Sequence, residues 1–276
     1  MLVHGSGPED RDESIGPNKT FKDLALGLAS RGIAVLRYDK LSQVYGKQPA
    51  KLLAIKQPTV KDEVIDDALA AVAWLRKDRH IDQACVVVLG HSLGGSLAPR
   101  IGAADSKIAG LISMAGNTRK LADAMLAQST YLVAASGPTT PDGQKQIDDM
   151  KALVARVNKL TPADVASEER ISGAPVSYWP DLDGYDPIAT AKSITQPMLF
   201  LQGERDYQVT FADDFAAWKA GLVGRPRTTF HSYPALNHLF LPGTGQSLPN
   251  EYNTPGHVPE EVVRDIAEWL GSICRK

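Results

Sequence analysis

The sequence predicts an α/β protein with a mostly parallel sheet that is covered by helices on both faces. Short apolar runs alternate along the chain with longer amphipathic stretches, which is typical of strand–helix–strand units. The run at residues 84–89 is continuously apolar and rich in valine, as expected of a central strand that is buried on both faces. A chain of 276 residues has room for one or two domains of this class.

The expected elements follow one another in a regular order. Residues 1–3 are predicted to be the end of a buried strand, and residues 33–38 a second strand. Residues 59–78 are predicted to form a helix with Thr59 as its N-cap, because apolar residues recur on one face. Further strands are expected at residues 84–89, 108–114, 197–201 and 228–233, and further helices at residues 97–104, 211–220 and 259–270.

Residues 121–195 break this alternation. They contain two helical stretches, at 121–134 and 144–160, and a Pro-, Gly- and Tyr-rich loop at 172–187, but no convincing strand. The segment falls between two strands, on the side of a parallel sheet where functional loops emerge. We therefore expect a core made of residues 1–120 and 196–276, with 121–195 inserted as a helical cap.

Composition excludes several classes of protein. The chain has 30 Lys and Arg against 32 Asp and Glu, and these charges interleave, so a nucleic-acid partner is not expected. Its longest apolar stretch is far shorter than the ~20 residues that span a bilayer. The two cysteines argue against a disulfide framework or a Cys-based zinc site, and Cys85 is predicted to be a small buried hydrophobe. No metal-ligand set, Gly-x-Gly-x-x-Gly or Walker loop indicates a cofactor.

Ser92 is the predicted nucleophile. It lies in Gly-His-Ser-Leu-Gly-Gly (residues 90–95), directly after the strongest predicted strand and before a helix, which is the context of a nucleophile elbow. So sharp a turn brings backbone against backbone and requires small neighbours, and it raises the serine hydroxyl above the sheet at a helix N-terminus. The alternative is that Ser92 only caps the helix.

A serine nucleophile needs a base and a group that orients the base, and enzymes with such an elbow have the order serine, acid, histidine along the chain. Asp206 follows the predicted strand at 197–201, and His238 follows the next strand. We predict these two as acid and base. Glu204 is the competing acid, and His231 is the competing histidine, although its place within a strand favours packing against a sheet face.

The oxyanion hole is predicted from two segments. One donor is the backbone N–H of Leu93, the residue after the nucleophile, and the other comes from the Gly5–Ser6 segment, where glycines let the backbone approach a substrate.

These motifs together resemble the α/β-hydrolase superfamily, and most closely the bacterial serine esterases of the dienelactone-hydrolase-like and EstD-like branch. The resemblance rests on the Ser92 elbow, the Asp206 loop and five further segments, which are His-Gly-Ser-Gly-Pro (4–8), Asp-Arg-Asp-Glu (10–13), Gly-Pro-Asn-Lys (16–19), Arg-Tyr-Asp-Lys (37–40) and Asn-His-Leu-Phe (237–240). It implies a carboxylesterase that acts on small to medium acyl esters beneath a helical cap. The chain is also similar to the catalytic domains of bile-acid-CoA acyltransferases and acyl-CoA thioesterases.

The resemblance also bears on the first residues. Such folds normally place two antiparallel strands and most of a third before the His-Gly motif, so the N-terminal strands are expected to be missing from this chain. The strand at residues 1–3 is then expected to be an exposed sheet edge, which either makes this chain less stable than a form with a longer N-terminus or leads it to pair with a second copy in a homodimer.

The sequence as a whole predicts a cofactor-free serine hydrolase of a small-molecule ester, with Ser92, His238 and Asp206 as a triad. An acyl-CoA thioesterase or acyltransferase, a serine peptidase and an inactive binding module of the same fold are the alternatives. Tyr178, Trp179 and Tyr185 either line the entrance to the site or pack within a loop.

Overall fold

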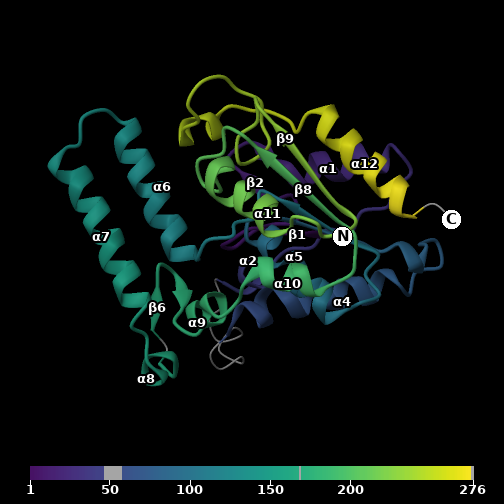
Figure 1. Ribbon diagram of the computed structural model, residues 1–276, viewed down its shortest axis with the longest axis horizontal. Helices are drawn as coiled ribbons and strands as arrows, with labels where there is room; N and C mark the ends of the chain where they lie inside the picture. The colour runs from purple at the N-terminus through teal and green to yellow at the C-terminus, as the bar shows by residue number, and fades with distance from the viewer. Residues whose placement is uncertain (47–57, 168, 275–276) are drawn as a thin grey trace.

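A parallel five-stranded sheet forms the centre of the molecule (Figure 1). The computed structural model describes residues 1–46, 58–167 and 169–274. In the sheet the strand order is β1-β4-β5-β8-β9, and all four neighbouring pairs are parallel. The strands are β1 (Leu2–Val3), β4 (Val87–His91), β5 (Gly110–Met114), β8 (Met198–Gly203) and β9 (Thr228–Tyr233).

Helices cover both faces of this sheet, as the sequence predicts. Along β4, Val87 and Leu89 join the apolar cluster beneath α1 and α12, whereas Val88 joins the cluster on the opposite face. The first face is covered by α1 (Thr20–Ala29) and α12 (Glu260–Cys274), which lie side by side in Figure 1. The second face is covered by α4 (Asp66–Leu75), α5 (Leu93–Ala104), α10 (Pro187–Ser193) and α11 (Ala216–Gly221).

Several predicted elements begin or end elsewhere. The predicted helix at 59–78 begins as a π-helical turn, η1 (Lys61–Ile65), and continues as α4, and η3 (Phe211–Phe215) precedes α11 in the same way. Helix α5 begins at Leu93 rather than at residue 97. The sequence pattern missed its first turn because Gly94 and Gly95 have low helix propensity, although close backbone contacts require glycine at both positions. The remaining short elements are β2 (Ser14–Ile15), β3 (Asn18–Lys19), α2 (Leu41–Tyr45), η2 (Gln83–Cys85) and η4 (Pro249–Asn253).

The expected exposed edge at residues 1–3 is wrong. Met1, Leu2 and Val3 are 8%, 2% and 0% exposed, because residues 33–38 run along the side of β1 that faces away from β4. The Leu2 N–H donates to the carbonyl oxygen of Leu36 at 3.1 Å. This is the only backbone bond between the two segments in the part of the chain that is described, so residues 33–38 do not form the predicted strand ladder.

Residues 121–195 are largely helical, and residues 121–165 extend to one side of the sheet (Figure 1), whereas α10 at the end of the segment packs on the second face. They form α6 (Leu121–Ala135), α7 (Pro141–Val157), α8 (Pro162–Val165) and α9 (Tyr178–Asp183), followed by α10. A two-residue hairpin that the sequence did not predict, β6 (Arg170–Ile171) with β7 (Ala174–Pro175), precedes α9. Tyr131 of α6 stacks on Tyr207 at 5.2 Å between ring centroids, so α6 contacts the core.

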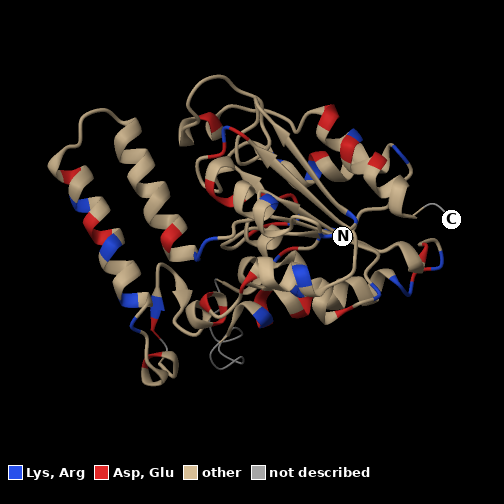
Figure 2. Cartoon of the chain, in the orientation of Figure 1, with Lys and Arg blue, Asp and Glu red and all other residues tan. Residues whose placement is uncertain are grey.

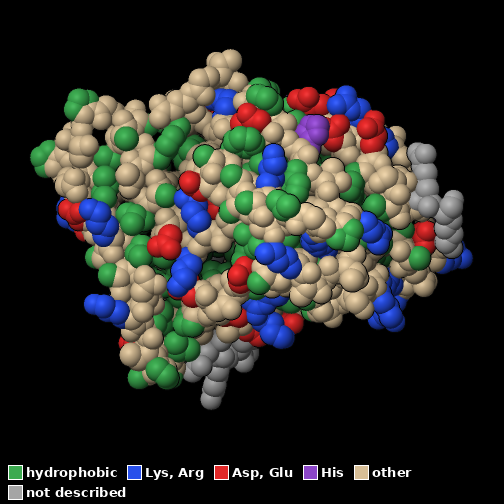
Figure 3. All heavy atoms as spheres, viewed as in Figure 1, with side chains coloured by type: hydrophobic (Ala, Val, Ile, Leu, Met, Phe, Trp, Pro, Cys, Tyr) green, Lys and Arg blue, Asp and Glu red, His purple; other side chains and the backbone are tan. Residues whose placement is uncertain are grey.

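Charges of both signs are mixed over the surface. Figure 2 shows acidic and basic residues along α7 and α12, whereas α6 has a single charged residue, Asp123. On the face shown in Figure 3, Lys and Arg side chains lie among Asp and Glu side chains without a field of one sign. Within the described ranges, no helix has the length and apolarity that a membrane span requires.

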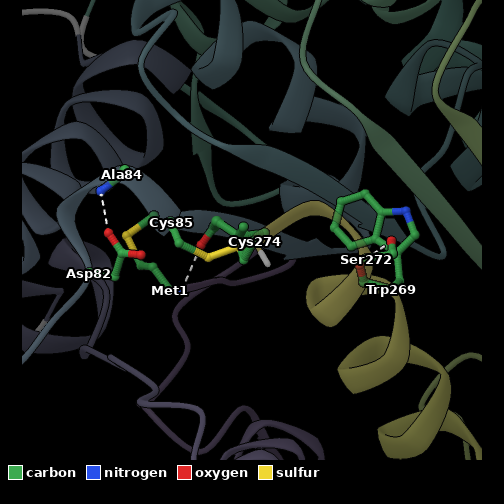
Figure 4. Close-up of a disulfide and its surroundings, with 8 residues drawn as sticks. Met1, Asp82, Ala84, Cys85, Trp269, Ser272 and Cys274 are labelled. Carbon is green, nitrogen blue, oxygen red and sulfur yellow. Dashed lines mark hydrogen bonds between the residues drawn. A yellow bond between two sulfur atoms is a disulfide. The ribbon is translucent and has the colours of Figure 1, made fainter. Parts of the chain in front are cut away.

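The two cysteines form a disulfide, contrary to the prediction that Cys85 is a free buried hydrophobe. Cys85 ends η2, two residues before β4 begins, and Cys274 ends α12, with 5.5 Å between their Cα atoms (Figure 4). The two cysteines are separated by 189 positions in the sequence, which hides this pairing, because only the packing of α12 on the sheet brings them together. The bond ties the last helix to the turn that leads into β4.

Removing this disulfide should lower the free energy of unfolding by several kcal/mol. In the entropic description, a cross-link that closes so long a loop raises the free energy of the unfolded state by about 5 kcal/mol. Cys274→Ser should therefore lower the melting temperature in non-reducing buffer. The double variant with Cys85→Ser should melt like either single variant. Equal melting temperatures for wild type and Cys274→Ser without reductant would contradict the disulfide.

Candidate active site

Ser92 occupies a strained backbone conformation between β4 and α5. Its φ of 52° and ψ of −119° are rare for a residue with a side chain and are found where surrounding structure enforces them. The Ser92 N–H donates to the carbonyl oxygen of Met114 at 2.9 Å, and its carbonyl oxygen accepts from Ser96 N–H as α5 begins. The strain is thus held by β5 on one side and by the helix on the other.

The glycines around Ser92 are required by close backbone contacts. A Cβ at Gly90 would lie 2.0 Å from the carbonyl oxygen of Gly94, and a Cβ at Gly94 would lie 2.3 Å from that of Val3. At Gly95 it would meet the Gly116 Cα at 3.0 Å. Side chains at Gly90 and Gly94 are excluded by backbone, which is the crowding that the sequence motif predicts.

Asp206 and His238 are brought together by the loops that follow β8 and β9. Asp206 Oδ2 lies 2.7 Å from His238 Nδ1, and both residues are 4% exposed. Because a carboxylate only accepts, Nδ1 carries the proton and Nε2 of a neutral His238 is left as the basic nitrogen. The His238 ring lies 4.8 Å from that of His91, the residue before Ser92.

Other groups fix the Asp206 carboxylate. Its Oδ1 accepts the backbone N–H groups of Gln208 and Val209 at 2.8 and 3.0 Å, and its Oδ2 also accepts from the Gln202 side-chain amide at 3.1 Å. The competing acid Glu204 is exposed and accepts instead from the Ser232 hydroxyl at 2.7 Å. Of the two acids, Asp206 is therefore the one in contact with His238.

The loop that bears His238 is held by its neighbours. Asn237 Oδ1 accepts from the N–H groups of Leu239 and Leu241, and the carbonyl oxygen of His238 accepts from His91 Nε2 at 2.9 Å. The competing histidine His231 is far from buried, with 49% of its side chain exposed, and it pairs with Asp265 at 3.3 Å. His231 points, as expected, to a sheet face, where its ring lies 4.7 Å from that of Tyr233 and beside α12, but it is only partly covered there because β9 is the edge strand.

The loop at residues 4–8 lies against Ser92. A Cβ on Gly5 would lie 3.2 Å from the Ser92 Cβ, which places the Gly5 backbone in contact with the nucleophile. The Gly5 N–H, however, donates to Glu13 Oε1 at 3.0 Å and is not free. The N–H of Ser6 has no hydrogen-bond partner among the residues that the structure describes. Of the Gly5–Ser6 segment, the free donor is therefore the Ser6 N–H.

A buried ion pair lies directly behind this loop. His91 Nδ1 is 3.0 Å from Glu13 Oε1, and both side chains are almost inaccessible. Burial by itself would lower the pKa of His91, but the Glu13 carboxylate outweighs it and raises the pKa to about 9. The sequence did not predict that His91 and Glu13 form a buried pair, although Glu13 ends one of the segments that carry the family resemblance.

A cavity of about 670 Å³ opens above Ser92. The 4–8 loop contributes Ser6 and Gly7, and the elbow contributes Ser92 and Leu93. Much of the remaining wall is apolar and comes from the 121–195 segment, through Leu121, Ala124, Met125, Ala174, Tyr178 and Trp179. Tyr185, by contrast, packs on α5, where its hydroxyl donates to the Ser96 carbonyl oxygen at 2.9 Å, so the three aromatic residues divide between the two predicted roles.

The described ranges contain no side-chain cluster that is suited to bind a metal ion. There, His, Cys, Asp and Glu side chains do not gather in groups of three or more that could hold an ion.

The parallel sheet, the strained serine between strand and helix and the buried carboxylate–histidine pair together define the class of α/β enzymes with a nucleophile elbow. Comparison with known proteins agrees. A model of the alpha/beta hydrolase family matches residues 1–267, so the chain belongs to this family.

Among characterised relatives, the chain is 42% identical over 270 residues to Esterase EstD of Thermotoga maritima. The match covers 98% of this chain and 61% of the length of that esterase.

Solved structures share the fold at low identity. The esterase Pf2001 of Pyrococcus furiosus matches with a TM-score of 0.58 at 17% identity, over 99% of this chain and 81% of that one. Est1E of Butyrivibrio proteoclasticus, solved with ferulic acid bound, gives 0.57 at 15% identity over 100% and 88%. The hydrolase GrgF of Penicillium sp. sh18 gives 0.60 at 13% identity over 99% and 89%.

The His91–Glu13 pair should make stability fall as the pH rises from about 6.5 to about 9. The folded protein binds the His91 proton more tightly than the unfolded chain, whose histidine pKa is about 6.5, so the contribution is full below pH 6.5 and is lost as the pH approaches 9. In urea unfolding, the free energy of unfolding should fall less between pH 6.5 and pH 9.5 for Glu13→Gln than for wild type. The exposed Glu204→Gln is the control and should follow wild type, and equal losses in all three proteins would refute the coupling.

Proposed function

We propose that this chain is a serine esterase that hydrolyses carboxylic esters of small to medium acyl groups through an acyl-enzyme. The observation that carries this proposal is the strained Ser92 at the floor of a largely apolar cavity, with the buried Asp206–His238 pair in the adjoining loops. The 42% identity to a protein named an esterase supports the same reaction.

The proposed chemistry follows from the free groups. The Ser92 hydroxyl attacks the ester carbonyl carbon while His238 Nε2 takes its proton, and the same proton then goes to the leaving alcohol. Asp206 keeps Nδ1 protonated and stabilises the imidazolium. Water, activated by His238, releases the acyl group from Ser92 and regenerates the enzyme.

The oxyanion of the tetrahedral intermediate is assigned two backbone donors in this proposal. Leu93 is the first residue of α5, so its N–H has no intrahelical acceptor and points with the helix dipole towards developing negative charge. The Ser6 N–H is the second donor. Gly5, predicted as part of this hole, serves instead as the residue that is small enough to touch Ser92, because its own N–H is bound to Glu13.

Residues 121–195 are assigned the role of a cap over the core formed by residues 1–120 and 196–276. They supply most of the apolar cavity wall, and Leu121, Met125 and Trp179 face the space above Ser92. An apolar wall of this kind accepts the acyl or alcohol chain of an ester, whereas the backbone donors and Ser92 handle its polar carboxyl group.

Replacing Ser92 tests the mechanism. Ser92→Ala should lower turnover of p-nitrophenyl esters by about 10⁴-fold or more and should abolish labelling by a fluorophosphonate, with the melting temperature little changed. Assays on one acyl-CoA and one peptide anilide in parallel separate an esterase from a thioesterase or peptidase. A Ser92→Ala enzyme that keeps more than about a tenth of the esterase activity would exclude the mechanism.

The two candidate acids provide a matched pair of variants. Asp206→Asn should lower kcat by orders of magnitude, since the amide cannot hold His238 in the required tautomer, as in other triads where about 10⁴-fold is lost. Glu204→Gln, two residues away on the same loop, should leave kcat nearly unchanged because Glu204 binds only Ser232. The reverse order of effects would transfer the acid role to Glu204.

A further inference from the structure

Lys40 is a buried lysine that contacts neither Ser92 nor the Asp206–His238 pair. Only 2% of its side chain is exposed, and burial lowers its pKa from the ordinary value while Glu63, 3.6 Å away, opposes that shift. Its ammonium donates to the carbonyl oxygens of Gly5 at 2.9 Å and Gly7 at 2.8 Å. An ion that costs several kcal/mol to bury is therefore directed at the backbone of the loop beside Ser92.

The bond to Gly5 has a specific geometric consequence. The carbonyl group of Gly5 and the N–H group of Ser6 belong to one planar trans peptide unit, in which they point in opposite directions. When Lys40 Nζ binds the Gly5 oxygen, the Ser6 N–H must point away from Lys40. The positive charge on the oxygen side also polarises the peptide and strengthens its N–H as a donor.

Glu13 fixes the preceding peptide unit, between His4 and Gly5. The Gly5 N–H donates to Glu13 Oε1, so the peptide units on both sides of the Gly5 Cα are bound to buried ionised groups of opposite sign. The loop contains two glycines with little intrinsic preference for one conformation. Binding on both sides leaves the Ser6 N–H as the free donor beside Ser92.

The segments that bear Lys40 and Glu13 are joined to each other. Two ion pairs join them, Arg11 with Asp39 at 2.6 Å and Arg37 with Asp12. A backbone bond adds to these, in which the Lys40 N–H donates to the Glu9 carbonyl oxygen at 3.0 Å. Asp-Arg-Asp-Glu (10–13) and Arg-Tyr-Asp-Lys (37–40) are thus two sides of one clamp around residues 4–8.

The charge of Lys40 is also linked to the wall of the cavity. Glu63 of η1 is its nearest carboxylate, and the hydroxyl of Tyr178 in α9 donates to the other oxygen of Glu63 at 2.6 Å. Glu63 and Tyr178 both line the cavity above Ser92. Lys40 therefore has a counter-ion that is itself held by the 121–195 segment.

From this arrangement we infer that Lys40 is a positioning residue of the oxyanion hole, which orients and polarises the Gly5–Ser6 peptide so that the Ser6 N–H donates to the tetrahedral oxyanion. The inference rests on the proposed esterase function. It assigns Lys40 no contact with substrate, so its effect belongs to the transition state and not to binding of the ester.

Lys40→Met removes the charge with little change of volume, and Lys40→Gln is a second variant that keeps a shorter, neutral donor. Kinetics with p-nitrophenyl butyrate are normalised to active sites titrated with a fluorophosphonate, so that misfolded protein does not count. We expect kcat to fall roughly 10- to 100-fold with KM nearly unchanged, because one oxyanion donor is worth up to about 10²–10³. The exposed Lys22→Met on α1 is the matched control and should retain wild-type kinetics.

Affinity for a butyl trifluoromethyl ketone, which forms a tetrahedral adduct with the serine, separates positioning from a structural role. The loss of affinity in the Lys40 variants should match their loss of kcat/KM, whereas a loss of kcat with unchanged ketone affinity would overturn the inference. A kcat within about threefold of wild type in either variant would also overturn it. If either result occurs while Ser92→Ala is inactive, only the inference about Lys40 fails and the proposed esterase function stands. An active Ser92→Ala would instead overturn the esterase proposal itself.

Discussion

Backbone crowding at the turn between β4 and α5 is the constraint on which the site depends. Gly94 lies so close to the carbonyl oxygens of Val3 and His4 that a methyl group could not be inserted, and Gly90 lies equally close to the carbonyl of Gly94. These contacts lock the elbow to β1 and therefore to the loop that leaves β1. The position of Ser92 and that of the residue 4–8 backbone are consequently set by one contact, and neither can shift without the other.

Buried charge around this turn does the positioning that side-chain packing cannot. Lys40, Glu13, His91 and Asp206 are all nearly inaccessible, and each has a carboxylate, a cation or backbone groups as partners. Unpaired, any of these ions would cost several kcal/mol, so the network tolerates few alternative arrangements. Its partners are mainly backbone atoms of the loops bearing Ser6 and His238. A rigid frame of this kind keeps donors oriented before the substrate arrives, which is the condition for electrostatic stabilisation of an oxyanion.

The 121–195 segment is built differently from the core. Helix α6 is almost uncharged and lies between charged α7 and the core, where its Tyr131 stacks on Tyr207 next to Asp206 (Figures 1 and 2). Its contribution to the cavity is mainly apolar surface without directional bonds. In the proposed esterase, differences in this wall would alter which acyl or alcohol chains fit, whereas Ser92, Asp206 and His238 belong to the loops that follow the core strands. Among the residues that the structure describes, the Tyr178–Glu63–Lys40 contacts are the polar route by which the segment reaches the 4–8 loop.

Local sequence determined the parallel sheet, the elbow at Ser92 and the order of Asp206 and His238, because strand periodicity and the glycines of a tight turn are properties of neighbouring residues. Tertiary structure alone decided what depends on residues far apart. The Cys85–Cys274 bond spans 189 residues, residues 33–38 cover β1 without completing a ladder, and Glu13 takes the Gly5 N–H that the motif suggested for the oxyanion. The role of Lys40 was hidden for the same reason. A lysine in a sequence is ordinarily a solvated charge, and only the convergence of two segments and η1 buries it against a backbone carbonyl.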